Sequence, residues 1–269
     1  MPPRKKTATL ANTIVIVDGS YFIFYRFFAT LRWFKFRNKD RPDSEIVSDA
    51  EFIPTLQKHI ESSLKNIIKK HNISVDRLIF CKDCPQSEIW RMKHLPTYKA
   101  GRVMKHEIPA QVFVDLYESQ KVFGVDHLEA DDCAALIHRI IRTVSKTQRI
   151  VMITNDNDYM QLVDEATTIE PLSGAEKKAT GMDLVIKILT GDKSDNIPPI
   201  YPMCGQKTAA RIAEHLEEWL QKQNTDVVAA YERNRLLIDF AAIPENLVEE
   251  FNDKWRSDVL KLVEDVVAA

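Results

Sequence analysis

Acidic residues at five places in the chain carry the strongest chemical signal of the sequence. Asp192 and Asp195 lie three residues apart in the stretch 191–198, which reads Gly-Asp-Lys-Ser-Asp-Asn-Ile-Pro. Hard carboxylate oxygens suit Mg²⁺ or Mn²⁺. Two such ions roughly 3.5–4 Å apart can clamp a phosphodiester, activate a water and stabilise the leaving oxygen. The candidate ligands are nine: Asp18, Asp83, Glu129, Asp131, Asp132, Asp156, Asp158, Asp192 and Asp195.

Each group of acids also has a simpler interpretation. Residues 129–132 open a helical pattern, where acids favour the helix dipole, although three neighbouring carboxylates repel one another unless cations are near. Residues 155–158 read Asn-Asp-Asn-Asp, which is typical of an Asx-rich turn. A calcium EF-hand is poorly supported there, because the sixth position lacks Gly and the twelfth lacks Glu. Scattered surface acids remain the alternative to a shared metal pocket.

Short β-branched runs predict the elements that would bring these acids together. Each run is followed by an aspartate and predicts a buried parallel strand: residues 13–17, 77–81 and 149–154. Helical patterns lie between them, at 53–70, 110–123 and 131–144. Strands that alternate with helices predict a doubly wound α/β fold with a mostly parallel sheet. Because ligands bind beyond the carboxyl ends of such strands, the aspartates are expected at one edge.

The second half of the chain reads differently. The strand signal fades after about residue 165, and residues 167–181 are expected to form a polar loop or hairpin. Helices are predicted at 182–190, 206–219, 226–237 and 246–267. The last of these carries apolar residues at steps of four, which indicates a helix packed on the core.

A basic segment with aromatic residues follows the second predicted strand. Residues 88–108 interleave Trp90 and Tyr98 with five cationic side chains: Arg91, Lys93, Lys99, Arg102 and Lys105. Basic residues neutralise phosphates and aromatic rings stack on bases, so this segment could draw a single strand toward the acids. A solvated helical hairpin is the alternative.

A second phosphate contact is indicated at a helix start near residue 206. Gly205 interrupts the chain before Gln206-Lys207-Thr208. Free backbone N–H groups at such a start favour a phosphate, and the Lys207 charge would reinforce them. An ordinary helix start explains the same residues equally well.

Bulk properties set limits on the class of protein. The net charge of −2 gives no global nucleic-acid signal, and 45% hydrophobic residues predict a real core. No apolar run reaches about 18 residues, and the basic cluster at 4–6 precedes no apolar segment, so we expect neither a membrane span nor a secretory signal. Cys81 and Cys84 form a C-x-x-C pair, for which buried reduced thiols in a reducing compartment are favoured over redox or zinc chemistry.

Together these motifs resemble the bacterial and phage branch of the 5′ nuclease (flap endonuclease-like) family, which includes the 5′ nuclease domain of bacterial DNA polymerase I. The resemblance spans nearly the whole chain. It is carried by Val-Asp-Gly-Ser at 17–20, Glu-Ala-Asp-Asp at 129–132 and the stretch 191–198. The segment from His94 to Arg102 is similar to the Tyr-Lys-x-x-Arg segment of the family's helical arch.

The resemblance implies a fold and a set of domains. We expect a PIN-like nuclease core at 13–165 with a helical arch at about 84–108. A basic tail at 1–12 would precede it, and a helix–three-turn–helix region with further helices would occupy 166–269. Where the family has Gly-Ile-Gly before the Lys, this chain has Met203-Cys204-Gly205, and losing the first Gly restricts that loop.

The resemblance also implies residue roles. One Mg²⁺ would be held by Asp18, Asp83, Glu129, Asp131 and Asp132. A second, with Mn²⁺ as a substitute for either, would be held by Asp156, Asp158, Asp192 and Asp195. Tyr98, Lys99 and Arg102 would be catalytic, the last two by binding the scissile phosphate. DNA contacts would come from Arg91, Lys93, Lys105, Gly205, Lys207 and Thr208, with a K⁺ ion at the helix–three-turn–helix.

The expected function is that of a metal-dependent 5′-3′ exonuclease and structure-specific flap endonuclease in replication or repair. Its partners would be branched or 5′-flapped duplex DNA and single-stranded 5′ ends, and RNA primers would be cut as well. We expect a stand-alone, soluble monomer without membrane contact, in the cytoplasm of a bacterial cell or a phage-infected host. The alternatives are an RNA-directed PIN-like nuclease and a non-catalytic branched-DNA-binding protein.

Overall fold

A five-stranded parallel sheet forms the centre of the computed structural model, which describes residues 11–37, 39–102, 106–174 and 184–264. The strand order is β3-β2-β1-β4-β5. All neighbours are parallel, and β1 at the centre pairs with β2 and β4. The bounds are β1 (Thr13–Asp18), β2 (Leu78–Cys81), β3 (Lys121–Phe123), β4 (Arg149–Ile153) and β5 (Thr167–Glu170).

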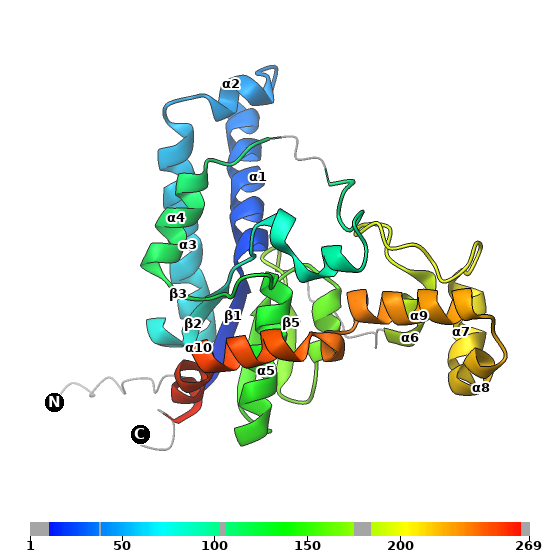
Figure 1. Cartoon of the computed structure of the whole chain (residues 1–269). Coiled ribbons are helices and arrows are strands. Elements are labelled where there is room, and N and C mark those ends of the chain that lie inside the picture. The colour runs from blue at the N-terminus through cyan, green and yellow to red at the C-terminus, as the bar shows by residue number, and fades with distance from the viewer. Residues whose placement is uncertain (1–10, 38, 103–105, 175–183, 265–269) are drawn as a thin grey trace.

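Alternate residues of the strands build two separate apolar layers. Ile14 and Ile16 of β1 face a layer formed with helices α5 (Ala130–Val144) and α10 (Glu245–Glu264). Val15 and Val17 face the opposite layer, formed with four helices: α1 (Gly19–Arg37), α2 (Asp43–Val47), α3 (Phe52–His71) and α4 (Ala110–Ser119). The predicted doubly wound α/β fold, with helices on both faces of a parallel sheet, is therefore confirmed (Figure 1).

A third apolar cluster stands apart from the sheet. Its helices are α6 (Leu184–Thr190), α7 (Gln206–Ala213), α8 (Leu216–Gln221) and α9 (Thr225–Ile238). Figure 1 shows them beside the sheet, on the side opposite α3 and α4. Short 3₁₀ helices connect other elements: η1 (Val75–Arg77), η2 (Gln86–Glu88), η3 (Trp90–Lys93), η4 (Asp158–Leu162) and η5 (Phe240–Ala242).

The sheet continues beyond residue 165, where the sequence predicts a domain boundary. β5 follows that boundary but pairs with β4 in the same sheet. α10, near the end of the chain, packs on α5 in the first layer. β5 lies in the stretch predicted as a polar loop or hairpin, because Thr-Thr-Ile-Glu has little apolar character. The separate helical unit is therefore limited to the region from α6 to α9.

Other predicted elements also differ from the structure. The helix expected at 110–123 ends at Ser119, and β3 follows it. The helix expected at 206–219 is broken at 214–215 into α7 and α8. The described part of the expected arch, 84–102 and 106–108, holds two 3₁₀ helices and turns rather than a long helix. Residues 1–10 of the expected basic tail lie outside the described residues.

Candidate metal and nucleic-acid site

Five of the nine predicted acids line one cavity at the carboxyl edge of the sheet. The cavity has a volume of about 300 Å³. Its walls include Ser20, Tyr21 and Phe24 of α1, and the cationic side chains of Lys99 and Arg102 border it. The carboxylates come from the ends of β1, β2 and β4 and from the start of α5: Asp18, Asp83, Glu129, Asp131 and Asp156.

Asp18 is fixed where β1 passes directly into α1. The backbone N–H of Tyr21 donates to Asp18 Oδ1 at 3.0 Å, and Thr154 Oγ1 donates to Asp18 Oδ2 at 3.3 Å. A Cβ atom on Gly19 would lie 2.5 Å from the Tyr117 hydroxyl, so glycine lets α1 begin immediately after Asp18. Burial, followed by the charge of Asp83, raises the pKa of Asp18 to about 7.

The first turn of α5 presents the next carboxylates. Asp83 Oδ1 accepts a hydrogen bond from the Ala130 N–H at 2.8 Å, and Asp131 Oδ1 accepts one from the Asp132 N–H at 2.8 Å. Burial raises the pKa of Asp131 well above its ordinary value, and the charges of Glu129 and Asp132 act in the same direction. The cavity thus gathers negative charge without a matching number of cations.

Asp132 lies behind the cavity, and its role as a metal ligand stays a prediction. A carboxylate oxygen of it does lie within 4.8 Å of oxygens of Glu129 and Asp131. However, Asp132 is 0% exposed, and Arg91 donates to both of its oxygens at 2.6 and 2.7 Å. Trp90 Nε1 donates to Oδ2 as well, at 3.0 Å. The carboxylate is therefore already saturated by the protein.

Arg91, a predicted DNA contact, is held in the same buried network. It is 2% exposed, and besides Asp132 it contacts Glu129 Oε2 at 2.8 Å and the Leu237 carbonyl at 2.9 Å. A buried guanidinium needs such a full set of acceptors. Arg91 joins the start of α5 to the end of α9 and is a structural residue.

Lys99 and Arg102 reach the cavity, whereas Tyr98 lies beneath it. Lys99 is ion-paired with Glu129, and Arg102 with Asp195. Tyr98 is 2% exposed, and its hydroxyl lies 3.1 Å from Glu129 Oε2 and 3.2 Å from Asp195 Oδ2. Burial raises the pKa of Tyr98 far above its ordinary value. The phenol therefore stays protonated and can only position the two carboxylates.

Charges from Arg91 and Lys99 dominate the ionisation of Glu129. Burial alone would raise the pKa of Glu129, but these two cations and the hydrogen bonds from Lys99 and Tyr98 hold it below its ordinary value. Asp195 is tied to the same segment through its backbone, because its carbonyl accepts a hydrogen bond from the Lys99 N–H at 2.9 Å. Asn196 Nδ2 adds a bond to the Thr97 carbonyl at 2.9 Å.

The remaining acids, Asp158 and Asp192, are outside the cavity lining and share one lysine. Lys187 of α6 is ion-paired with Asp158 and lies 2.8 Å from Asp192 Oδ2. Burial raises the pKa of Asp158 to about 6 despite the Lys187 charge. Burial also raises that of Asp192, but hydrogen bonds from Lys187 and Ser194 bring it down to about 2. Sequence reasoning missed Lys187, because a lone lysine on a short helix gives no signal of its partners.

Gly191 sets the path of the loop that carries these acids. Its φ is +69°, and a Cβ atom there would lie 2.3 Å from the Ile197 carbonyl oxygen. Asp192 and Ile197 exchange two backbone hydrogen bonds, of 2.9 and 2.8 Å, across the loop. Only glycine fits this close approach without strain.

The predicted duplex contacts lie at the start of α7. Gly205 is the N-cap residue, Lys207 is exposed and Thr208 is partly buried. Met203 adopts a φ of +66° and is 94% exposed, so the loop restriction expected from losing the first Gly falls on this residue. A cavity of about 730 Å³ adjoins the loop and the helix start. In the other predicted segment Lys93 is exposed, and Lys105 lies outside the described residues.

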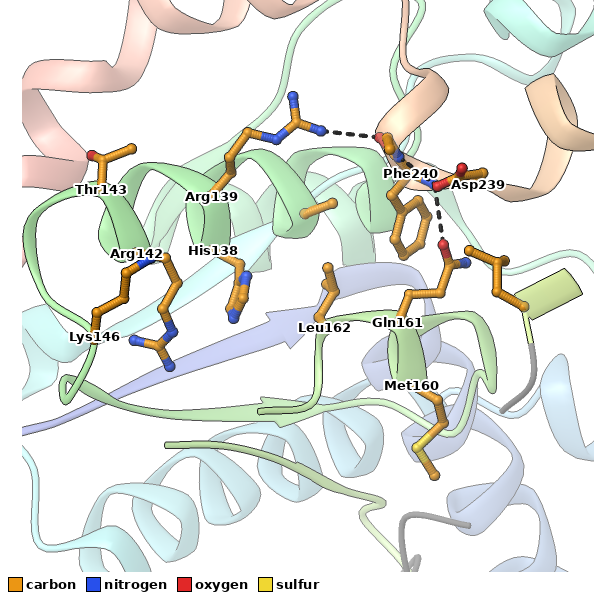
Figure 2. A pocket seen from close by; sticks show the side chains of 13 residues that line it. His138, Arg139, Arg142, Thr143, Lys146, Met160, Gln161, Leu162, Asp239 and Phe240 are labelled. Carbon is orange, nitrogen blue, oxygen red and sulfur yellow. Dashed lines mark hydrogen bonds between the residues drawn. The ribbon is translucent and has the colours of Figure 1, made fainter. Parts of the chain in front are cut away.

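Another cavity, larger than the one that the five acids line, contains none of the predicted acids. It has a volume of about 620 Å³ and lies among α5, η4 and η5. Figure 2 shows how its polar groups satisfy one another: Arg139 donates to the Phe240 carbonyl at 3.1 Å, and the Phe240 N–H donates to Gln161 Oε1 at 3.1 Å. This region ties the segment before α10 to the core rather than gathering catalytic groups.

Two other sequence expectations bear on the class of site. The cysteines are free, and burial raises the pKa of Cys84 to about 12 and that of Cys81 well above its ordinary value. In the part of the chain that the structure describes, no helix combines the length and apolar character that a membrane crossing needs.

Comparison with known proteins places this site in context. A ribonuclease H of Enterobacteria phage T4 is 23% identical over 252 residues, which cover 80% of this chain and 80% of that protein. A 5′-3′ exonuclease of Streptomyces coelicolor is 27% identical over 183 residues, covering 55% of this chain and 58% of that protein. The flap endonuclease of bacteriophage T5, solved with DNA and metal ions, has the same fold with a TM-score of 0.64. That match has 18% identity and covers 94% of this chain and 99% of the other.

The family match extends across the sheet and the acids that it positions. The family described as the 5′-3′ exonuclease N-terminal resolvase-like domain matches residues 13–188, from the start of β1 into α6. This range contains the five carboxylates of the cavity together with Lys99, Arg102 and Lys187. The chain therefore belongs to the family of the 5′-3′ exonuclease N-terminal resolvase-like domain.

Proposed function

We propose that the protein is a metal-dependent nuclease that cuts DNA at 5′ ends and at the base of 5′ flaps. The observation that carries the proposal is the cavity of five carboxylates bordered by Lys99 and Arg102. Membership of a nuclease family supports the hydrolysis of phosphodiesters. Relatives named as 5′-3′ exonucleases and a similar fold named as a flap endonuclease support the choice of substrate.

The donor set of the cavity fits a divalent cation. Burial and neighbouring carboxylates raise the pKa values of Asp18 and Asp131, and the nearby cations do not offset this shift. When bound, Mg²⁺ or Mn²⁺ would activate a water and neutralise charge on the phosphate. The residues that would hold the first ion are Asp18, Asp83, Glu129, Asp131 and Asp156. A second ion would use Asp158, Asp192 and Asp195, whose present partners are cationic side chains.

The cationic side chains of the cavity would bind the scissile phosphate. Arg102 is half-exposed and pairs only with Asp195 among the described residues, so its guanidinium can turn toward a ligand. Lys99 lies deeper and would meet the phosphate beside Glu129. Both charges would stabilise the pentacovalent transition state more than the substrate, which is how such groups raise a rate. Tyr98 acts through the two carboxylates that it contacts.

Duplex DNA would be held by the start of α7, next to the Asp192 loop. The exposed Lys207 and the backbone N–H groups of the first turn after Gly205 suit a backbone phosphate. Thr208 and Lys93 would add contacts, and a K⁺ ion could bind at the same loop. We further propose that the protein acts as a monomer, because each group of the site comes from one chain.

A direct test uses a 5′-labelled flap substrate with Mg²⁺ or with EDTA. The wild type should cut near the junction in Mg²⁺ and stop in EDTA. Asp156→Asn should reduce cutting, whereas Asp253→Asn, an exposed acid on α10, should leave it unchanged. Cutting that persists in EDTA, or no cutting under any condition, would contradict the proposal.

An RNA-directed nuclease is the second candidate function. The observation that favours it is the relative in phage T4, which is named a ribonuclease H. Running the same flap with an RNA or a DNA 5′ strand separates the two candidates. Faster cutting of RNA than of DNA substrates would replace the proposed DNA substrate with RNA. Binding of branched DNA without any cutting would identify a non-catalytic DNA-binding protein.

A further inference from the structure

The long helix α1 connects the cavity to an exposed face of aromatic and cationic side chains. Tyr21 and Phe24, in its first two turns, line the cavity. Farther along, Phe28 is 41% exposed and Phe36 is 84% exposed. Trp33 of the same helix is 40% exposed, so three of the seven exposed large hydrophobic side chains in the described structure lie on α1. Figure 1 shows α1 rising from the carboxyl end of β1, away from the sheet.

The spacing of these residues makes a continuous stripe. Phe24, Phe28, Arg32 and Phe36 recur every four residues, so they lie one above another on a slowly turning face. The stripe is about 18 Å long, because an α-helix rises about 1.5 Å per residue. It begins inside the cavity, where the phosphodiester would be cut, and it leads outward.

The charge of α1 indicates what the stripe would bind. The helix has four basic residues, Arg26, Arg32, Lys35 and Arg37, and no acidic residue. Lys35 is committed to Asp43. Arg32 and Arg37 have no ion pair in the described part of the chain, and the Arg37 guanidinium lies over the Trp33 ring. Exposed aromatic rings beside cations that form no ion pair in the described residues match a single strand of nucleic acid, in which bases stack and phosphates need neutralising.

We propose that the stripe Phe24, Phe28, Arg32 and Phe36 binds the single-stranded 5′ portion of the substrate outside the cavity. The proposal rests on the nuclease function argued above, to which it adds a path for the unpaired strand. Phe28 and Phe36 stack on bases, and Arg32 neutralises a phosphate between them. The stripe would then favour substrates with a long 5′ single strand over a nicked duplex that has none.

Binding is measured first, without cutting. Anisotropy of a 5′-labelled single strand is recorded with Mg²⁺ in an Asp131→Asn background. Phe36→Ala should weaken binding about fivefold or more, the cost of one lost stack, while Phe36→Tyr should keep the affinity. Arg32→Glu should make the affinity for the single strand less dependent on salt concentration, by about the slope that one phosphate contact contributes. Val75→Ala is the matched control, because Val75 is 65% exposed on η1, at the opposite edge of the sheet.

Cutting rates on two substrates then separate a role of the stripe in binding the single strand from a role of the cavity in the reaction. Phe36→Ala with an intact cavity should slow cutting of a long flap at limiting enzyme and leave a nicked duplex unchanged. Equal losses on both substrates, or unchanged single-strand affinity, would overturn the proposal. A wild type that cuts neither substrate contradicts the nuclease function, and the binding measurement still decides on the stripe. Sedimentation of wild type and Phe36→Ala adds a third outcome: a dimer lost on substitution would assign this face to self-association and reject the stripe.

Discussion

The cavity acids and the acids around them are the same residue types in opposite electrostatic situations. Asp18 and Asp131 lie in the cavity with raised pKa values, because burial and neighbouring carboxylates are not balanced by cations. Asp132 and Asp192 lie just outside it and are held by Arg91 and Lys187. The protein thus supplies cations to Asp132 and Asp192 but not enough positive charge to offset the burial of Asp18 and Asp131. Glu129 is intermediate, because it lines the cavity but is held by Arg91 and Lys99. Acids that the protein neutralises itself belong to its structure, whereas acids without enough positive charge nearby are suited to bind metal ions.

The largest expected effect is the loss of stability on replacing Arg91, the cation that holds Asp132. Arg91→Met leaves Asp132 buried without a cationic partner and Glu129 with Lys99 alone. Such a loss costs about 3–5 kcal/mol of the free energy of unfolding. Urea denaturation measures the change. Lys93→Met, an exposed neighbour, should change stability by less than about 0.5 kcal/mol. The double variant Arg91→Met with Asp132→Asn should recover part of the loss. A cost for Arg91→Met as small as that of Lys93→Met would mean that Arg91 faces solvent.

The raised pKa of Asp18 should make the free energy of unfolding depend on pH. The pKa of Asp18 is raised from 3.8 to about 7, so the folded protein binds this proton more tightly than the unfolded chain. The associated stabilisation is full below about pH 4 and is lost as the pH rises toward 7, which is opposite to the usual behaviour of a salt-bridged aspartate. The full shift corresponds to about 4 kcal/mol as an upper limit.

Asp18→Asn in EDTA isolates this contribution. The free energy of unfolding of the wild type, measured in urea between pH 4 and pH 7, should fall relative to that of the variant. Saturating Mg²⁺ should reduce the difference, because a bound cation favours the ionised carboxylate. Parallel pH profiles for the two proteins in EDTA would show that Asp18 is already compensated.

Removing one carboxylate that lines the cavity should mainly lower the rate of cutting. Asp131→Asn keeps the shape of the side chain but removes a charge that would hold the metal ion, and we expect cutting to slow by about 100-fold or more. The rate of flap cutting at saturating Mg²⁺ measures this effect. Raising the Mg²⁺ concentration should restore part of the rate if the loss is one of affinity. Retention of the full rate at low Mg²⁺ would remove Asp131 from the proposed ligands.

The sequence predicted the acids that line the cavity better than the cationic partners of the acids outside it, for a physical reason. Asp18 and Asp83 each follow a strand of apolar residues, and parallel strands bring their carboxyl ends to one edge. Arg91 was predicted to contact DNA because a cation beside an aromatic residue resembles a surface contact for nucleic acid. Its partner Asp132 is 41 residues away, a distance that local patterns cannot span. Lys187 was missed in the same way, since Asp158 lies 29 residues before it.

The smallest expected effect tests the acids that Lys187 holds. Lys187→Met removes the cation between Asp158 and Asp192, so the protein in EDTA should lose about 1–3 kcal/mol of stability, the cost of a buried group without its partner. If these acids also hold the proposed second ion, Mg²⁺ should restore more stability to the variant than it adds to the wild type, because the ion no longer competes with an ammonium group. Lys187→Arg keeps the charge and should behave like the wild type. Thermal unfolding with and without Mg²⁺ decides between the two outcomes: an equal Mg²⁺ response in all three proteins would mean that Lys187 and its aspartates belong to the scaffold, together with Arg91 and Asp132.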